Sequence, residues 1–227
     1  AVYRAWQAAG GPPPTVVAGH SLGEYSALVA AGAIAFKDAV PLVRFRAKAM
    51  QEAVPVGEGG MAAILGLSDD DVRAACAEAS VAGVIAGAKA AVEKACEVAK
   101  AKGAKRALPL PVSAPFHSSL LKPASDRLRE YLANVTVNAP VIPVINNVDV
   151  AVVSDPAAIK DALVRQAASP VRWVETVQKM KGDGITRVVE CGPGKVLAGL
   201  VKRIDGEIVG DAIFDPASLE AVLGQLK

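Results

Sequence analysis

The chain has 227 residues, of which 52% are hydrophobic and 21% are charged, and its formal net charge is +2. This composition excludes a disordered chain, and the near balance of charges excludes a strongly basic nucleic-acid-binding surface. No uninterrupted apolar run of about 18 residues is present, so no transmembrane helix is expected, and the length suits one large domain with or without a smaller inserted one.

Predicted strands and helices alternate along the chain. In chain order they are a helix over 1–9, a strand over 15–18, helices over 22–32 and 38–54, a strand over 61–67, a helix over 69–79, a strand over 81–86, a helix over 90–102, a strand over 105–112, a helix over 123–132, a strand over 141–145, helices over 156–168 and 170–181, a strand over 186–190, a helix to 204, and a final strand and helix. This alternation predicts a parallel sheet covered on both faces. On the 38–54 helix the apolar face is expected at Val40, Val43, Ala47, Met50 and Val54.

Two styles of sequence divide the chain. Residues 57–117 have the order β-α-β-α-β, which resembles a split βαβ sandwich lacking one strand. We therefore expect a small ferredoxin-like subdomain over 57–117, inserted into a discontinuous large α/β catalytic subdomain over 1–56 and 118–227 with an α/β-hydrolase-like core. Because residue 1 already lies within a predicted helix, we also expect that an N-terminal portion precedes this sequence.

The cysteines and histidines do not suggest a metal site. Cys76, Cys96 and Cys191 are far apart and form no Cys-x-x-Cys, and the chain has two histidines. We expect neither zinc binding nor disulfides. We expect a reduced, cytoplasmic protein without a signal peptide. Cys191 is predicted to be a small buried residue with no catalytic part.

A serine motif stands between a predicted strand and a predicted helix. Gly19-His20-Ser21-Leu22-Gly23 fits Gly-x-Ser-x-Gly, in which a tight turn exposes the hydroxyl at the C-terminal edge of a sheet. Glycines at both flanks would avoid clashes of Cβ atoms, and the backbone N–H of Leu22 would donate to an oxyanion. The alternative is a serine that only caps the helix beside packing glycines.

A nucleophilic serine needs a base. His20 adjoins Ser21 on the same turn, so its side chain should point away from the hydroxyl. His117 ends a predicted strand, from which its ring can return to Ser21, and we predict that it is the base rather than a structural histidine. A lipase or esterase fits this order poorly, because α/β-hydrolases place an acid between serine and histidine and the histidine near the chain end.

Five segments together resemble one family, the malonyl-CoA:acyl carrier protein transacylases of bacterial fatty-acid synthesis. They are GHSLGEYSAL at 19–28, MQEAVP at 50–55, AKRALPLPVSAPFH at 104–117, PVINNVD at 143–149 and ECGPGKVL at 190–197. The resemblance implies an [acyl-carrier-protein] S-malonyltransferase that moves a malonyl group from coenzyme A to the phosphopantetheine thiol of acyl carrier protein. It implies a ping-pong reaction with no cofactor beyond the substrate malonyl-CoA, in a monomer that binds neither nucleic acid nor membrane.

The resemblance also implies the roles of site residues. Ser21 would carry the acyl group, His117 would be its base, and the backbone carbonyl of Gln166 would orient that histidine. Arg46 would pair with the malonyl carboxylate through two parallel hydrogen bonds. The helix pattern alone does not choose between Arg44 and Arg46, because they flank opposite sides of the predicted apolar stripe.

Two segments of the family are absent from this sequence. One is an N-terminal segment with a Gly-Gln-Gly turn, which would supply the second oxyanion N–H and the first strand. The other is about a dozen residues between Gly83 and Val84 by the resemblance, which would supply the strand that the small subdomain lacks.

A basic cluster is a candidate docking site for acyl carrier protein, which is acidic. It is expected near the edge of a cleft between the two subdomains. An equally good interpretation is that these side chains are simply solvated at the ends of a helix and a strand and bind no partner. Its members are Lys100, Lys102, Lys105 and Arg106.

Two other functions remain open at this point. A serine esterase or thioesterase would hydrolyse the acyl-enzyme instead of passing it on. A non-catalytic docking module would bind carrier protein without acylation of the serine. The sequence does not decide between malonyl and methylmalonyl groups.

Overall fold

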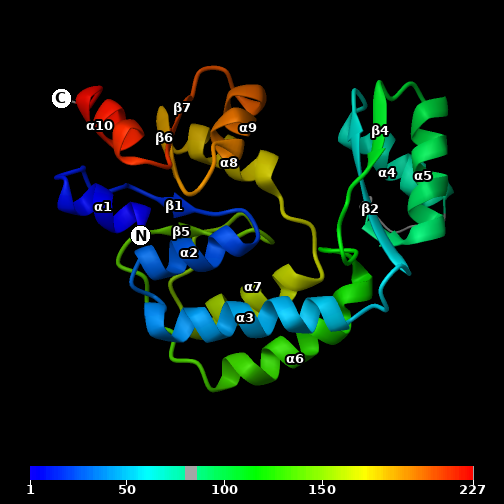
Figure 1. The fold of residues 1–227 in the computed structure, drawn as a ribbon, viewed down its shortest axis with the longest axis horizontal. Coiled ribbons are helices and arrows are strands. Elements are labelled where there is room, and N and C mark those ends of the chain that lie inside the picture. The colour runs from blue at the N-terminus through cyan, green and yellow to red at the C-terminus, as the bar shows by residue number, and fades with distance from the viewer. Residues whose placement is uncertain (80–85, 227) are drawn as a thin grey trace.

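The computed structural model describes residues 1–79 and 86–226. Within these ranges the protein is a mixed α/β structure whose strands form two parallel pairs and one three-stranded antiparallel sheet (Figure 1). No helix of the described ranges is both long and apolar enough to cross a membrane.

The first parallel pair carries the serine turn. Strand β1 (Val17–Ala18) pairs with β5 (Val144–Ile145), and helix α2 (Leu22–Ala30) follows β1 after a short turn. Both strands are shorter than predicted, and Val141, expected in the second strand, is 83% exposed. Prolines at 140 and 143 lack the N–H that a ladder needs, which explains why this strand begins late.

A layer of helices packs beneath this pair and encloses the largest core (Figure 1). It contains α3 (Phe36–Glu52), α6 (Lys122–Ala133) and α7 (Pro156–Ala167), with the short η1 (Ser119–Leu121) leading into α6. Prolines begin α6 and α7 at positions where no intrahelical N–H is needed, and Asp155 caps α7 by accepting from the Ala158 N–H at 2.7 Å.

The predicted apolar face of the 38–54 helix is only partly confirmed: Met50 and Val54 are buried and Val43 packs against the core, but Ala47 is exposed. The buried side chains of α3 are Ala39, Leu42, Arg46, Ala49 and Met50, whereas Val40 is 49% exposed. Small alanines face the core here, so the larger valine side chains mislead a reading based on hydrophobic size. The correction places Arg46 in the middle of the buried stripe instead of at its flank.

The second parallel pair lies apart from the first among the described residues, so the predicted strands do not join into one sheet there. Strand β6 (Arg187–Cys191) pairs with β7 (Val209–Ile213). Around this pair lie α1 (Val2–Ala8), α8 (Trp173–Gly182), α9 (Val196–Ile204) and α10 (Pro216–Gly224). Cys191 ends β6 and is exposed, contrary to the prediction of a buried residue.

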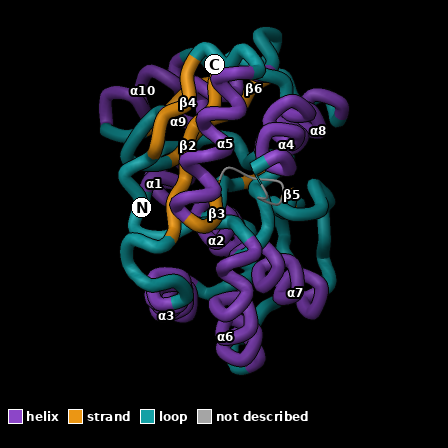
Figure 2. Tube along the Cα trace, turned by 90° about the vertical axis from the view of Figure 1, so that its right-hand side faces the viewer, coloured by secondary structure: helices purple, strands orange, loops and turns teal. Residues whose placement is uncertain are grey.

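Residues 59–109, between α3 and η1, contain the antiparallel sheet and face the viewer in Figure 2; we call them the 59–109 unit. Its antiparallel sheet has the order β3-β2-β4, with two helices packed together. The elements are β2 (Gly59–Leu65), α4 (Asp69–Glu78), β3 (Ala86–Ala88), α5 (Lys89–Ala101) and β4 (Arg106–Pro109). The predicted strand over 81–86 lies outside the described residues except for Ala86. The expected order β-α-β-α-β is otherwise found, and the boundaries at 57 and 117 stay a prediction.

Candidate active site

Ser21 occupies a strained turn between β1 and α2. Its φ is 52° and its ψ is −104°, in the left-handed region of φ that side chains rarely adopt. A Cβ on Gly19 would lie 2.0 Å from the carbonyl carbon of Gly23, so glycine is required at position 19. Gly23 itself has open space, so the expectation that both glycines avoid clashes holds only for the first. The Ser21 side chain makes no capping bond to α2, and this disfavours a serine that only caps the helix.

His117 brings its ring to the serine hydroxyl. The distance from His117 Nε2 to Ser21 Oγ is 2.7 Å, and Nδ1 lies 2.9 Å from the carbonyl oxygen of Gln166 and 3.2 Å from that of Ser169. Carbonyls only accept hydrogen bonds, so Nδ1 carries the proton and Nε2 is left to accept from the hydroxyl. His20 packs against Trp173 instead, with 5.8 Å between the two ring centroids in an edge-to-face arrangement.

The environment keeps His117 neutral near pH 7. Burial lowers the pKa of its imidazole to about 4. The bond to the Gln166 carbonyl opposes this shift, and the Arg46 guanidinium adds to it. A neutral imidazole with a free Nε2 lone pair is the form that acts as a general base.

Arg46 reaches the same hydroxyl from α3. Its Nη2 donates to Ser21 Oγ at 2.8 Å and to the side-chain Oε1 of Gln166 at 3.0 Å. The guanidinium carbon lies 5.4 Å from the centre of the Tyr25 ring, and Nε is buried without a hydrogen-bond partner. Arg46 is 7% exposed, whereas Arg44 lies on the exposed side of the helix. A buried guanidinium with unused donors is suited to receive an anion.

Leu22, the residue directly after Ser21, carries the first backbone N–H of α2. Among the described residues this N–H makes no hydrogen bond, while the next two amides donate to the carbonyls of His20 and Ser21. A free N–H at a helix start is a suitable donor to a developing oxyanion. The Leu22 side chain is 53% exposed.

Sequence reasoning missed Asn147, which holds the serine turn from both sides. Its Oδ1 accepts from the Ser21 N–H at 2.8 Å, and its Nδ2 donates to the Gly19 carbonyl at 2.8 Å. Its own N–H donates to Glu24 Oε2 at 3.0 Å. Asn147 lies in the segment PVINNVD, which supports the family resemblance, but no pattern in that segment indicates that Asn147 reaches the serine turn.

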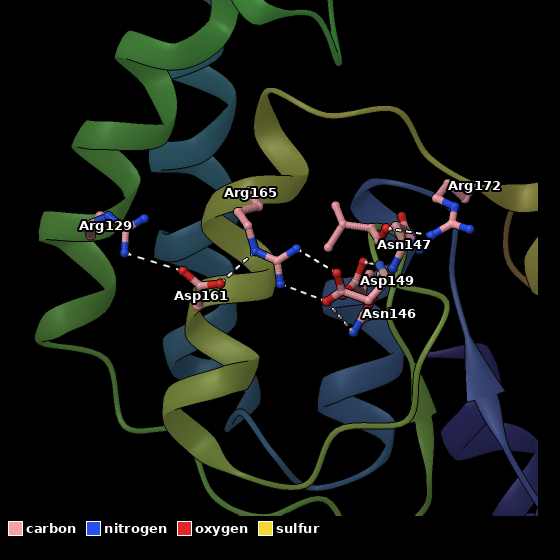
Figure 3. A network of polar contacts seen from close by, with 9 residues as sticks. Arg129, Asn146, Asn147, Asp149, Asp161, Arg165 and Arg172 are labelled. Atoms are coloured by element: carbon pink, nitrogen blue, oxygen red, sulfur yellow. Dashed lines mark hydrogen bonds and ion pairs between the residues drawn. The ribbon is translucent and has the colours of Figure 1, made fainter.

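Charged side chains fix the loop that carries Asn147 (Figure 3). Arg165 of α7 binds both carboxylate oxygens of Asp149 at 2.7 Å and donates from Nε to Asp161 at 2.6 Å. Arg172 donates to the Val148 carbonyl at 3.2 Å. The Arg165 guanidinium lowers the pKa of Asp149. A bidentate pair is geometrically restrictive, so the loop is held in one position against α2.

Glu24 is the second residue that sequence reasoning missed. It is 2% exposed, and its Oε2 accepts from Gln166 Nε2 at 2.8 Å as well as from Asn147. Burial raises the pKa of this carboxyl to about 7, partly opposed by these two hydrogen bonds. The acid stands three residues after Ser21 on α2, where it looks like an ordinary helix residue.

The basic cluster lies far from the serine. Leu65 pairs with Arg106 at one end of β2, and Gly59 touches Pro115 at the other end, two residues before His117. With a rise of about 3.3 Å per residue, the two ends of this strand are roughly 20 Å apart. Lys105 and Arg106 therefore lie at the end of β2 far from His117, and Lys102 is paired with Glu78 at 3.4 Å; docking of acyl carrier protein on this cluster stays a prediction.

Comparisons with known proteins place the chain among acyltransferases. The family model described as "Acyl transferase domain" matches residues 1–227. A "Malonyl CoA-acyl carrier protein transacylase" of Escherichia coli (strain K12) is 52% identical over 98% of this chain and 76% of its own length. An acyl-carrier-protein S-malonyltransferase of Burkholderia pseudomallei 1710b has a TM-score of 0.96 and 72% identity, over 98% of this chain and 77% of that one. A malonyl-transacylase solved in complex with its type II PKS acyl-carrier protein has a TM-score of 0.96 and 48% identity, over 99% and 77% of the two chains.

Proposed function

The chain belongs to the acyl transferase domain family, and from that membership we propose that Ser21 carries a malonyl group from coenzyme A to acyl carrier protein with His117 as its base. The activity is that of an [acyl-carrier-protein] S-malonyltransferase of fatty-acid synthesis, with acyl carrier protein as partner. One observation carries the residue roles: His117 Nε2 lies 2.7 Å from Ser21 Oγ while Nδ1 is held by the Gln166 carbonyl.

In the first half-reaction, the serine oxygen attacks the thioester carbon of malonyl-CoA. The hydroxyl proton moves to Nε2 of His117, and the carbonyl oxygen becomes an oxyanion that accepts from the Leu22 N–H. Collapse of the tetrahedral intermediate breaks the carbon–sulfur bond, and the imidazolium returns its proton to the sulfur of coenzyme A. The Gln166 carbonyl favours this step because it keeps Nδ1 protonated and the ring oriented.

The second half-reaction reverses these steps with another thiol. His117 takes the proton of the phosphopantetheine thiol of acyl carrier protein, and the thiolate attacks the malonyl-serine ester. The ester oxygen leaves and recovers the proton from Nε2, which regenerates Ser21. No cofactor is required, because each half-reaction exchanges an acyl group between an oxygen and a sulfur.

Arg46 is the proposed partner of the malonyl carboxylate. Its Nη2 donates to Ser21 Oγ and Gln166 Oε1, and within the described ranges the remaining donors are free for a bidentate pair with a carboxylate. An acetyl group offers no carboxylate and leaves the buried guanidinium without its counter-charge, so malonyl-CoA should be preferred. A methylmalonyl group carries the same carboxylate, and this argument does not separate it from malonyl.

The finer architecture belongs to the same proposal. We interpret residues 1–56 and 118–227 as an α/β-hydrolase-like catalytic subdomain and residues 57–117 as a ferredoxin-like insertion. The parallel pair beneath Ser21 supports the first assignment, and the antiparallel order β3-β2-β4 supports the second. We further propose a monomer that acts in the cytoplasm and does not bind nucleic acid or membrane.

The basic cluster keeps only a modest role in the proposal. Lys100, Lys102, Lys105 and Arg106 are exposed and would attract an acidic carrier protein over a distance instead of contacting it beside Ser21.

The test is intact-mass analysis in two steps. Mixing with malonyl-CoA should give a stable adduct of malonyl mass, and adding acyl carrier protein with its phosphopantetheine arm should move that mass to the carrier. Release of free malonate without carrier protein would support a thioesterase instead, and binding of carrier protein without any adduct would support a docking module.

A further inference from the structure

Glu24 has no part in the reaction steps above, yet it lies inside the site. Its Oε2 accepts from Gln166 Nε2 at 2.8 Å and from the Asn147 N–H at 3.0 Å. It is 2% exposed and has no salt bridge among the described residues. A buried carboxylate is costly, so its retention beside the serine calls for a physical reason.

The hydrogen bonds around Gln166 leave its side-chain amide only one orientation. Nε2 donates to Glu24 Oε2 and to the Ser21 carbonyl at 3.0 Å, and both of these groups only accept. Oε1 accepts from Arg46 Nη2 at 3.0 Å, and a guanidinium only donates. If the amide were rotated by 180°, its oxygen would face two acceptors, Glu24 Oε2 and the Ser21 carbonyl, and its nitrogen would face a donor, Arg46 Nη2.

The position of Arg46 depends on this amide. Among the described residues its hydrogen-bond partners are Gln166 Oε1 and Ser21 Oγ, and its Nε has none. Once Ser21 is acylated, its oxygen becomes part of an ester and accepts more weakly. Among the described residues the Gln166 oxygen is then the remaining hydrogen-bond acceptor that holds the guanidinium beside the acyl chain.

We propose that Glu24 is a positioning residue for malonyl selectivity: its carboxylate fixes the Gln166 amide, whose oxygen holds Arg46 where the substrate carboxylate arrives. The inference rests on the carboxylate-binding role proposed for Arg46. It assigns to Gln166 a function of its side chain in addition to that of its backbone carbonyl, so one residue links the base, the nucleophile and the carboxylate-binding guanidinium.

The test compares two substitutions with two substrates. E24L removes both acceptor oxygens at similar volume, and E24Q retains one oxygen that can accept from Gln166. We expect E24L to raise the KM for malonyl-CoA about 10-fold, the effect of one lost buried hydrogen bond, so that the ratio of kcat/KM for malonyl-CoA to kcat/KM for acetyl-CoA falls by about the same factor. E24Q should retain most of the malonyl preference. Equal losses for both substrates, or an unchanged preference in E24L, would overturn the proposal.

Q166M provides the same test should E24L not fold. It removes the side-chain amide and keeps the backbone carbonyl that holds His117. The malonyl preference should fall as in E24L, and a uniform loss for both substrates would count against the proposal.

R46M separates this inference from the proposed function. If R46M keeps the malonyl preference, the role of Arg46 fails and the inference fails with it. If R46M abolishes the preference while E24L and Q166M keep it, only the positioning role is overturned. The double variant E24L/R46M should lose no more preference than R46M alone, because both changes act through one guanidinium.

Discussion

The polar side chains around Ser21 and those of the 59–109 unit differ in their exposure to solvent. Ser21 and four polar side chains around it are linked by hydrogen bonds, and these four side chains belong to residues that are less than 8% exposed. They are Glu24, Arg46, Asn147 and Gln166. In the 59–109 unit, ion pairs such as Arg73–Asp70 and Lys94–Glu97 stand on the surface, with side chains more than 60% exposed.

This difference shows which polar contacts can fix the geometry of reacting groups. Buried hydrogen bonds are directional and strong because water does not compete, so they fix atoms to within the tolerance of a reaction. Exposed ion pairs contribute about 0–1 kcal/mol and impose little geometry. The segment that follows the 59–109 unit, between β4 and η1, delivers His117 to the site.

The largest expected effect comes from removing the base. H117A should lower malonyl transfer by about 10³-fold, because the serine then lacks a proton acceptor. The measurement is the initial rate of malonyl transfer to carrier protein. H20A is the matched control, since His20 packs on Trp173 and not on Ser21, and it should remain within a few-fold of the wild-type rate. A comparable collapse in H20A would contradict the assignment.

The next effect concerns the residue that braces the serine turn. N147A removes the acceptor of the Ser21 N–H and the donor to the Gly19 carbonyl. Because a displacement of about 1 Å costs about 10²-fold, kcat should fall by roughly that factor with a smaller change in KM. N134A, on the exposed end of α6, is the control and should leave kcat unchanged. A wild-type kcat in N147A would show that the turn does not depend on the amide.

Much of this site follows from the sequence, and the failures have physical causes. Ser21 and His117 were predictable because Gly-x-Ser-x-Gly stands between a strand and a helix, and because histidine is scarce. Choosing Arg46 over Arg44 required the family resemblance, since alanines form the buried stripe of α3. Glu24 and Asn147 escaped prediction because their roles depend on contacts between residues more than 120 positions apart.

The arrangement of the strands in space was less predictable than the order of helices and strands along the chain. Most helices were located within a few residues, because their prolines and caps mark the ends. The strands around β1 and β5 were predicted too long, and the predicted parallel strands do not join into one sheet among the described residues. A strand's direction relative to its neighbours decides which end faces the site, and no local pattern encodes that direction.

A moderate effect on stability should distinguish Glu24 from a surface glutamate. Folding raises the pKa of Glu24 from 4.5 to about 7, so the native state binds the proton more tightly than the unfolded state between these values. Wild-type stability from this group is therefore lost as pH rises from 4.5 to 7, by about 3 kcal/mol at most. E24Q lacks this titration, so the free energy of unfolding of E24Q minus that of the wild type should increase as the pH rises over this range. Chemical denaturation between pH 4.5 and 8 measures the difference.

The matched control for that experiment is E97Q in the 59–109 unit. Glu97 is 71% exposed and paired with Lys94, so its removal should change stability by less than about 0.5 kcal/mol at every pH. If wild type and E24Q keep a constant difference across the range, the buried titration is disproved.

The smallest expected effect concerns the basic cluster. Replacing Lys100, Lys102, Lys105 and Arg106 by glutamine should lower kcat/KM for acyl carrier protein about 2- to 5-fold at low salt, and less at about 0.15 M salt where charges are screened within roughly 8 Å. Loading of Ser21 from malonyl-CoA should not change. A loss of more than about 50-fold would indicate direct docking on this end of β2.

The account depends most on one covalent bond, so locating the malonyl group is its most direct test. After mixing with malonyl-CoA and proteolysis, the account predicts one malonylated peptide, that containing Ser21, and no malonylated peptide from S21A. Malonylation that persists in S21A, or that maps to another residue in the wild type, would contradict it.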